Sequence, residues 1–394
     1  MDILGNAVRR PLSRRVEGAA RGVTVVRGAP PPEDPPRSVS IVELEERIAS
    51  LDPETRAAAE RIFSVTTTVG RLDPPVEMRE WITKQFGSVD AVIAQTVVRV
   101  TNLVTFEGAL FNDLRARRPA EVKGGADTRE TIEKARGDPF CHPETGTPAD
   151  TFGRIKGAHG ITASNVAKYD GYHGVLVFDD HDPLVPMTDD VIRDRLATAR
   201  GWAQAAHDDD PAARYYFLLW NCLWRAGGSI VHGHMQMTAT RGMHYPKIEQ
   251  LRQQAIAYDE RHQRDYFDDL WRVHEALGLG VERGGARVFA SLTPVKESEV
   301  VILGRAGEDE VTLAPAIALA IGAFRARGVV AYNFALFLPP LSTDGNDWRR
   351  FPPQARLVDR GDPANKTSDI GAMELYAASV VAADPFRVVE ALQR

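Results

Sequence analysis

The sequence predicts an α+β protein in which a unit of strands and helices occurs twice, preceded by an N-terminal helical extension. Three observations support this fold class. Short apolar stretches of strand length alternate with longer amphipathic stretches from about residue 105 onward. Their order recurs in two halves, 105–245 and 246–394, as a repeat of pattern and not of sequence. The 394 residues are 43% hydrophobic and 26% charged, which is enough for a double unit and excludes a fibre or a wholly disordered chain.

The first 104 residues are expected to carry no chemistry. Residues 1–38 are interpreted as an extended tail, because the prolines of GAPPPEDPPR deny the backbone a helix or a ladder. A partner-binding arm is the alternative. Residues 39–104 are predicted to be helical, since IVELEERIASL spaces its apolar side chains as a helix does. Within them, 90–104 favours either an apolar helix or a passage from helix to strand.

The first half, 105–245, has a clear order of expected elements. A Thr-Asp pair at 188–189 is typical of a helix start. The glycine-rich turn Ala226-Gly227-Gly228-Ser229 separates two apolar stretches. We expect strands at 173–178, 215–221 and 230–240, and a helix at 188–206.

The second half, 246–394, opens with a long helical stretch at roughly 247–277. A strand–helix–strand order then follows. We expect strands at 287–292, 299–305 and 329–340, and a helix at 311–328.

Composition excludes several classes of protein. There are 48 Lys and Arg against 54 Asp and Glu, a formal net charge of −6, so we expect no nucleic-acid partner. No apolar run reaches the roughly 18 residues of a membrane helix, and the arginine-containing N-terminus has no apolar core of a secretory signal. Two cysteines cannot form a disulfide framework. These features predict a cytoplasmic protein.

The segment His232-Gly233-His234-Met235-Gln236 is the strongest candidate site. On a strand, alternate side chains share a face, so His232, His234 and Gln236 are predicted to point the same way. An imidazole can attack phosphorus and form a covalent intermediate, and an amide can hold a phosphate oxygen. The preceding Gly227, Gly228 and Ser229 offer backbone N–H groups and a hydroxyl for phosphate. The alternative is a pair of hydrogen-bonded core histidines.

The run WNCLWRAGGSIVHGHMQM resembles the active-site segment of galactose-1-phosphate uridylyltransferases, a branch of the histidine-triad superfamily. The match keeps the family's internal spacing at Asn221, Gly227, Ser229, His232, His234 and Gln236. The resemblance implies two histidine-triad-like units, of which 105–245 is catalytic and 246–394 lacks catalytic histidines. It implies that His234 is the nucleophile and that Asn221 orients it or supports the phosphoryl group. Gln236 and Ser229 would hold phosphate oxygens.

Further matches lie upstream. Arg115-Ala116-Arg117-Arg118-Pro119 resembles a family segment whose arginines face phosphates, which implies that role for Arg115 and Arg118. A solvated basic turn is the alternative. Asn165 stands where the family places an asparagine in the nucleotide pocket. The family's next residue is acidic, and Val166 here leaves recognition of the base and ribose in doubt.

The resemblance also implies a zinc site, with a changed ligand set. The family uses a Cys-x-x-Cys pair and two histidines, whereas this chain has Asp138 and Cys141 at the cysteine positions. With His181 and His232 they make an acceptable structural zinc site, and His142 is an alternative ligand. The sequence leaves open whether the metal is bound.

The implied activity is nucleotidyl transfer by a ping-pong route. The donor would be a nucleotide sugar or a dinucleotide, and the acceptor a phosphorylated group. A dinucleoside polyphosphate or nucleotide-sugar phosphorylase, a hydrolase, and a non-catalytic nucleotide sensor are the alternatives. The resemblance leaves a homodimer open.

Overall fold

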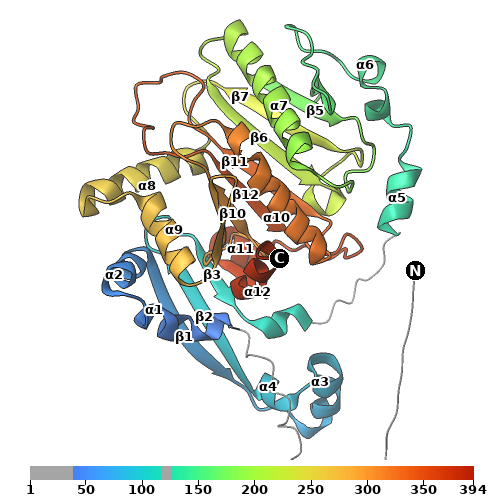
Figure 1. Cartoon of the computed structure of the whole chain (residues 1–394). Coiled ribbons are helices and arrows are strands. Elements are labelled where there is room, and N and C mark those ends of the chain that lie inside the picture. The colour runs from blue at the N-terminus through green and yellow to red at the C-terminus, as the bar shows by residue number, and fades with distance from the viewer. Residues whose placement is uncertain (1–38, 118–126) are drawn as a thin grey trace, which may run out of the picture. The chain divides into compact units, whose positions relative to one another are not determined.

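The computed structural model describes residues 39–117 and 127–394, and its contacts join 39–394 into one unit (Figure 1). The tail expected at 1–38 lies outside the described residues. No helix within the described ranges is long and apolar enough to cross a bilayer.

A nine-stranded sheet forms the centre of the fold, in the order β4-β5-β7-β6-β11-β12-β10-β9-β8. Every neighbouring pair in this sheet is antiparallel. The strands are β4 (Gly160–Ser164), β5 (Tyr172–Phe178), β6 (Tyr215–Cys222), β7 (His234–Thr240), β8 (Gly280–Arg283), β9 (Ala286–Ala290), β10 (Val300–Leu303), β11 (Tyr332–Phe337) and β12 (Gln354–Asp359).

The sheet confirms the predicted repeat of pattern. In the first half, β4, β5, helix α7 (Asp189–Asp209), β6 and β7 follow along the chain and lie in the order β4-β5-β7-β6. In the second half, β9, β10, helix α10 (Ala314–Ala326), β11 and β12 give the same arrangement, β9-β10-β12-β11. The halves meet where β6 pairs with β11. The boundary proposed after residue 245 therefore divides two halves of one sheet.

Helices α7 and α10 pack side by side over one face of this sheet (Figure 1). Thr188 caps α7 by accepting a hydrogen bond from Val191 N–H, as predicted. The helix presses Trp202 so close to β5 that a Cβ at Gly174 would lie 2.6 Å from the indole. Gly174 is opposite Met237 of β7, so Met235 and Met237 face α7 and the alternate residues His234 and Gln236 face the other side.

The N-terminal extension contains helices, but the prediction that 39–104 is all helical is wrong. Phe63–Arg71 is strand β1 and Ala94–Asn102 is strand β2 of a second sheet, ordered β1-β2-β3-β13. The β-branched run SVTTTV favours the extended backbone of β1. For 90–104, the passage from helix to strand is confirmed. The other elements here are α1 (Leu44–Ala49), α2 (Pro53–Ile62), α3 (Arg79–Phe86), α4 (Val89–Ile93), β3 (Gly108–Phe111) and β13 (Ser379–Val381).

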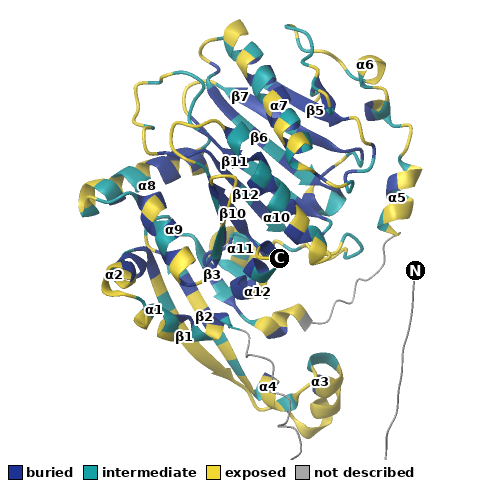
Figure 2. Cartoon of the chain, in the orientation of Figure 1, coloured by how far each residue is buried: buried dark blue, intermediate teal, exposed yellow. Residues whose placement is uncertain are grey.

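The helical stretch expected at 247–277 is two helices, α8 (Pro246–His262) and α9 (Tyr266–Ala276). Asp265 begins the second helix by accepting from the N–H groups of Phe267 and Asp268. Figure 2 shows that burial concentrates in the large sheet and that the far end of the β1–β2 ribbon is exposed. The remaining helices are α5 (Thr128–Lys134), α6 (Pro143–Gly146), α11 (Ala372–Tyr376) and α12 (Pro385–Leu392).

Candidate active site and metal-binding group

The predicted H-x-H-x-Q strand begins only at its second histidine. Strand β7 starts at His234, so His232 and Gly233 belong to the preceding loop. Gly233 N–H donates to the carbonyl of His181, and a Cβ at Gly233 would lie 2.5 Å from the Phe178 ring. These contacts hold the loop against the segment that follows β5. The prediction that His232 lies on this strand is therefore wrong, whereas His234 and Gln236 do share a strand face.

The ring of His234 has one nitrogen committed and one available. Its Nδ1 lies 2.8 Å from the carbonyl oxygen of His232. A carbonyl can only accept, so Nδ1 carries the hydrogen and Nε2 holds the lone pair. Nε2 has no hydrogen-bond partner among the described residues. Burial lowers the pKa of His234, which is 6% exposed, and this favours the neutral imidazole.

Strand register brings polar side chains from three strands together on the face away from α7. Gln236 of β7 lies opposite Leu219 of β6, and Asn221 of β6 lies opposite Asn333 of β11. A pocket of about 540 Å³ opens over this face. Its lining residues are Asn165, Ala167, Tyr169, Leu219, Asn221, Gly227, Ser229, Gln236, Asn333, Phe334 and Ala335. The pocket thus gathers five predicted site residues from three separate segments.

Two of the residues predicted for phosphate, Gly228 and Arg115, lie elsewhere. Gly228 does not line the pocket. Glycine is needed at this position for a steric reason. A Cβ there would lie 2.7 Å from the carbonyl oxygen of Asn221 and 3.0 Å from that of Leu223. Arg115 is exposed and lines a different pocket of about 260 Å³. Arg118 lies outside the described residues, so the phosphate roles of both arginines stay predictions.

Sequence reasoning missed Tyr169 and Asn333 as part of the site. The Tyr169 hydroxyl donates to Gln236 Oε1 at 3.1 Å, and His173 Nε2 lies 3.0 Å from the same oxygen. Asn333 donates to Asn221 Oδ1 at 2.7 Å. A signal was present for Asn333, because it is the one amide in the apolar run VVAYNFALFL.

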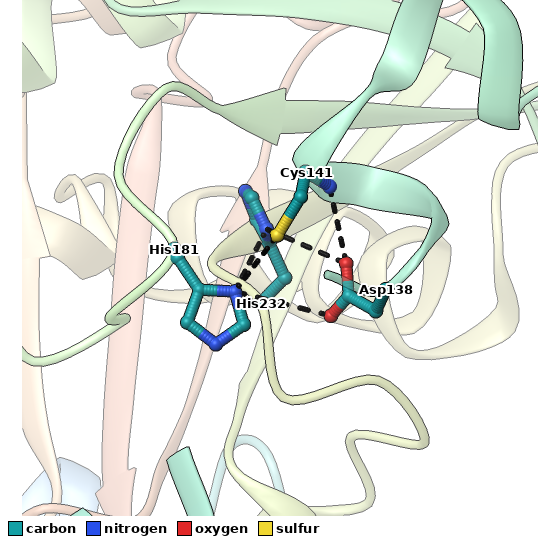
Figure 3. A group of neighbouring side chains, drawn as sticks. All are labelled: Asp138, Cys141, His181 and His232. Carbon is teal, nitrogen blue, oxygen red and sulfur yellow. Dashed lines mark hydrogen bonds and ion pairs between the residues drawn. The ribbon is translucent and has the colours of Figure 1, made fainter. Parts of the chain in front are cut away.

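The four predicted metal ligands do converge. Asp138 caps a 3-10 helix (Pro139–Cys141) that ends at Cys141, His181 follows β5, and His232 precedes β7. One ligand atom from each lies within 4.8 Å of all the others (Figure 3). His142, the alternative ligand, is exposed and lies outside this group.

The donor atoms of this group fit a metal ion. His181 Nε2 donates to the carbonyl of Ile132 and His232 Nε2 to that of Phe178, both at 2.8 Å. Both Nδ1 atoms therefore hold lone pairs, yet they lie only 3.2 Å apart. Cys141 Sγ is 3.2 Å and 3.5 Å from these nitrogens.

The fourth member of the group supplies an oxygen. Asp138 Oδ1 accepts from the backbone N–H groups of Phe140 and Cys141, whereas Oδ2 is buried with no hydrogen-bond partner among the described residues. Two nitrogens, a sulfur and a carboxylate oxygen suit tetrahedral Zn²⁺. The backbone carbonyls behind the imidazoles are the kind of groups that orient metal-binding histidines.

No protein-family model and no curated protein matches this sequence. Solved structures do match. An ADP-glucose phosphorylase from Arabidopsis thaliana with bound ADP-glucose is 17% identical with a TM-score of 0.56, over 74% of this chain and 96% of that one. A uridylyltransferase is 16% identical with a TM-score of 0.52, over 75% and 97%. A GalT-like protein from Arabidopsis thaliana is 17% identical with a TM-score of 0.50, over 66% and 92%.

These likenesses show a shared fold over about three quarters of this chain. It is the double-unit α+β fold seen in the ADP-glucose phosphorylase and the uridylyltransferase. The fold that the H-x-H-x-Q segment predicted is thereby confirmed.

Proposed function

We propose that this protein is a nucleotidyltransferase that carries a nucleoside monophosphate between phosphorylated compounds on His234. One observation carries the proposal: the imidazole is oriented by a hydrogen bond at Nδ1 and has a free lone pair at Nε2. The ring stands on the same sheet face as two amides, Asn221 and Gln236, that line an open pocket. A histidine kept only for core packing does not need the free nitrogen.

The reaction has two balanced halves. Nε2 of His234 attacks the α-phosphorus of a nucleoside diphosphate compound, the N–P bond forms, and the P–O bond to the leaving phosphate breaks with its electron pair. The imidazole becomes cationic, and the bond from Nδ1–H to the His232 carbonyl stabilises that charge. A phosphate oxygen of the acceptor then attacks phosphorus. The N–P bond breaks and the ring regains its lone pair.

In this proposal, groups around the pocket hold the transferring phosphoryl oxygens. Side-chain N–H groups of Asn221 and Gln236, the Ser229 hydroxyl and the backbone at Gly227 all line it. Preorganised donors of this kind stabilise charge that develops in the transition state. Asn165 lines the same pocket, which supports its role on the nucleotide.

A structural Zn²⁺ on Asp138, Cys141, His181 and His232 would complete the site. When bound, it supplies fixed geometry and no reaction step. His232 provides both a ligand nitrogen and the carbonyl that receives the Nδ1–H of His234. Order at the metal-binding group therefore sets the tautomer of the nucleophile.

A substrate panel tests the proposal. The protein is incubated with uridine and adenosine nucleotide sugars, ADP-glucose included, and with dinucleoside polyphosphates. Each donor is offered a sugar 1-phosphate, inorganic phosphate, or water alone. We expect turnover that requires a phosphorylated acceptor, with parallel lines in double-reciprocal plots.

The acceptor then separates the alternatives. Turnover with inorganic phosphate alone identifies a phosphorylase of the same chemistry, and turnover without an acceptor identifies a hydrolase. Tight nucleotide binding with no turnover in any arm would identify a sensor and contradict the proposal.

A further inference from the structure

Asn333 stands beside Asn221 but comes from β11, in the half of the chain that lacks catalytic histidines. Its Nδ2 donates to the backbone carbonyl of Ala226 at 2.8 Å and to Asn221 Oδ1 at 2.7 Å. Its Oδ1 accepts from Arg360 Nη1 at 2.5 Å. Both N–H hydrogens and the oxygen of the Asn333 amide therefore have a protein partner.

These partners leave only one orientation for the Asn333 amide. The Ala226 carbonyl can only accept and the Arg360 guanidinium can only donate. The nitrogen must therefore face Ala226 and the oxygen must face Arg360. In a reversed amide, the oxygen of Asn333 would face the Ala226 carbonyl oxygen, and its nitrogen would face the Arg360 guanidinium, so neither contact could be a hydrogen bond.

The orientation of Asn333 in turn fixes that of Asn221. The second hydrogen of Asn333 Nδ2 needs an acceptor, so the Asn221 atom in contact must be Oδ1. Asn221 Nδ2 is left on the opposite side of that amide, where a Cβ built on Gly227 would come within 3.9 Å of it. Gly227 and Asn221 both line the pocket. Asn221 consequently offers N–H groups, and not a carbonyl, to a bound anion.

The guanidinium behind Asn333 is itself held firmly. Arg360 makes a two-point contact with Asp369, with Nε and Nη2 at 2.8 Å and 2.9 Å from the carboxylate oxygens. Bidentate pairs fix both position and plane. A continuous chain therefore runs from Asp369 through Arg360 and Asn333 to Asn221.

We propose that Asn333 is a positioning residue that turns the Asn221 amide so that its N–H groups face the phosphate of the bound nucleotide. This inference rests on the proposed nucleotide site. It assigns a role to the second half of the chain: β11 supplies the orientation of a phosphate-binding group on β6.

The test compares Asn333→Ala with Asn333→Asp, each alone and in an Asn221→Ala background. Affinity for UDP and ADP is measured by calorimetry, so the readout does not depend on turnover. Asn333→Ala releases the Asn221 amide and should weaken binding roughly tenfold. Asn333→Asp keeps the shape and the Arg360 contact but cannot donate. Asn221 must then turn its oxygen to the phosphate, and the loss should exceed that of alanine.

A residue that is needed only for packing gives the reverse order, because aspartate has nearly the same shape as asparagine and alanine does not. In the Asn221→Ala background, neither substitution at 333 should weaken binding further. This background also separates positioning from charge repulsion, which would persist there. Gln393→Glu, at an exposed position beyond α12, is the charge control, and the thermal midpoint of each variant confirms folding.

The outcomes are distinct. An aspartate variant milder than the alanine variant, or additive losses in the Asn221→Ala background, would overturn the positioning role and leave the transferase proposal standing. A wild-type protein that binds neither UDP nor ADP would overturn the proposed function together with this inference.

Discussion

His232 and His234 are two residues apart, and their rings are held in opposite tautomers. His232 donates from Nε2 to the carbonyl of Phe178, which leaves Nδ1 for the metal-binding group. His234 donates from Nδ1 to the carbonyl of His232, which leaves Nε2 for the proposed attack on phosphorus. Two backbone carbonyls, those of Phe178 and His232, therefore give the two histidines different free nitrogens.

The first prediction at the residue scale concerns Cys141 in the metal-binding group. Cys141→Ser removes the thiolate and should lower bound zinc from about one ion per chain, together with the thermal midpoint. Elemental analysis of freshly purified protein measures the metal. Cys222→Ser is the matched control, since Cys222 Sγ contacts the Val330 carbonyl and lies outside the group. Equal zinc in both variants, or none in the wild type, would count against the site.

Gln236 gives a second prediction at this scale. Gln236→Ala removes hydrogen bonds to a charged phosphoryl group, each worth roughly 1.5–3 kcal/mol. We expect kcat/KM to fall by about one to two orders of magnitude while the fold is kept. Thr238 lies on the same strand and face, two residues further from His234 than Gln236. Thr238→Ala is the control and should keep near wild-type activity. Similar losses in both variants would show that strand packing, and not phosphate contact, is being measured.

At the scale of elements, the turn between β6 and β7 depends on a glycine for a steric reason. Gly228→Ala would place a Cβ 2.7 Å from the Asn221 carbonyl, so the turn or the end of β6 must shift. We expect a loss of roughly 1–3 kcal/mol in unfolding free energy and weaker nucleotide binding. Chemical denaturation and calorimetry measure the two. Gly171→Ala, with no atom within 4 Å of its added Cβ, is the control and should change neither.

Many of the helices and strands could be predicted from the sequence. Six of the nine strands of the large sheet follow short apolar runs, whereas β4, β8 and β12 were not predicted. Helix α7 follows a pattern of period 3.6, and a Thr-Asp cap signals its start. The H-x-H-x-Q spacing placed His234 and Gln236 on one face. It failed at His232 because a loop contact, from Gly233 to the His181 carbonyl, delays the start of β7. Local pattern carries no information about such a distant partner.

Two further features, strand β1 and the contact of Asn333 with Asn221, were not predicted from the sequence. Strand β1 is almost entirely exposed, so it lacks the alternation of a half-buried strand, and its β-branched composition was the remaining signal. Asn333 reaches Asn221 only because β11 pairs with β6, more than a hundred positions away in the chain. Exposure therefore hid β1, and pairing between distant strands hid the contact of Asn333.

At the scale of the whole molecule, one buried histidine ties the two sheets together. His274 of α9 packs its ring on Phe289 of β9 and near Phe63 of β1, with centroids 4.2 Å and 5.7 Å apart. It donates to the Leu270 carbonyl and accepts from Leu292 N–H. Burial lowers its pKa to about 4, so the folded state holds it neutral.

This burial predicts a pH dependence of stability. The folded pKa lies below the ordinary 6.5, so protonation favours the unfolded chain. The contribution is complete above about pH 6.5 and is lost as the pH falls toward 4. Between pH 7 and pH 5 the wild type should lose about 2 kcal/mol more than His274→Gln, which does not titrate. Urea unfolding at both pH values measures this, and parallel losses in the two proteins would refute the assignment.

The central claim is a covalent nucleotidyl group on His234. The most direct measurement is rapid quenching of the protein with an α-labelled nucleotide sugar in the absence of acceptor, followed by peptide mapping. The account predicts one acid-labile, base-stable nucleotidyl group on the peptide that contains His234. His234→Gly should fold, take no label, and transfer the nucleotidyl group to added imidazole. Wild-type turnover with no labelled histidine, or a His234→Gly protein that turns over at the wild-type rate without imidazole, would contradict the account.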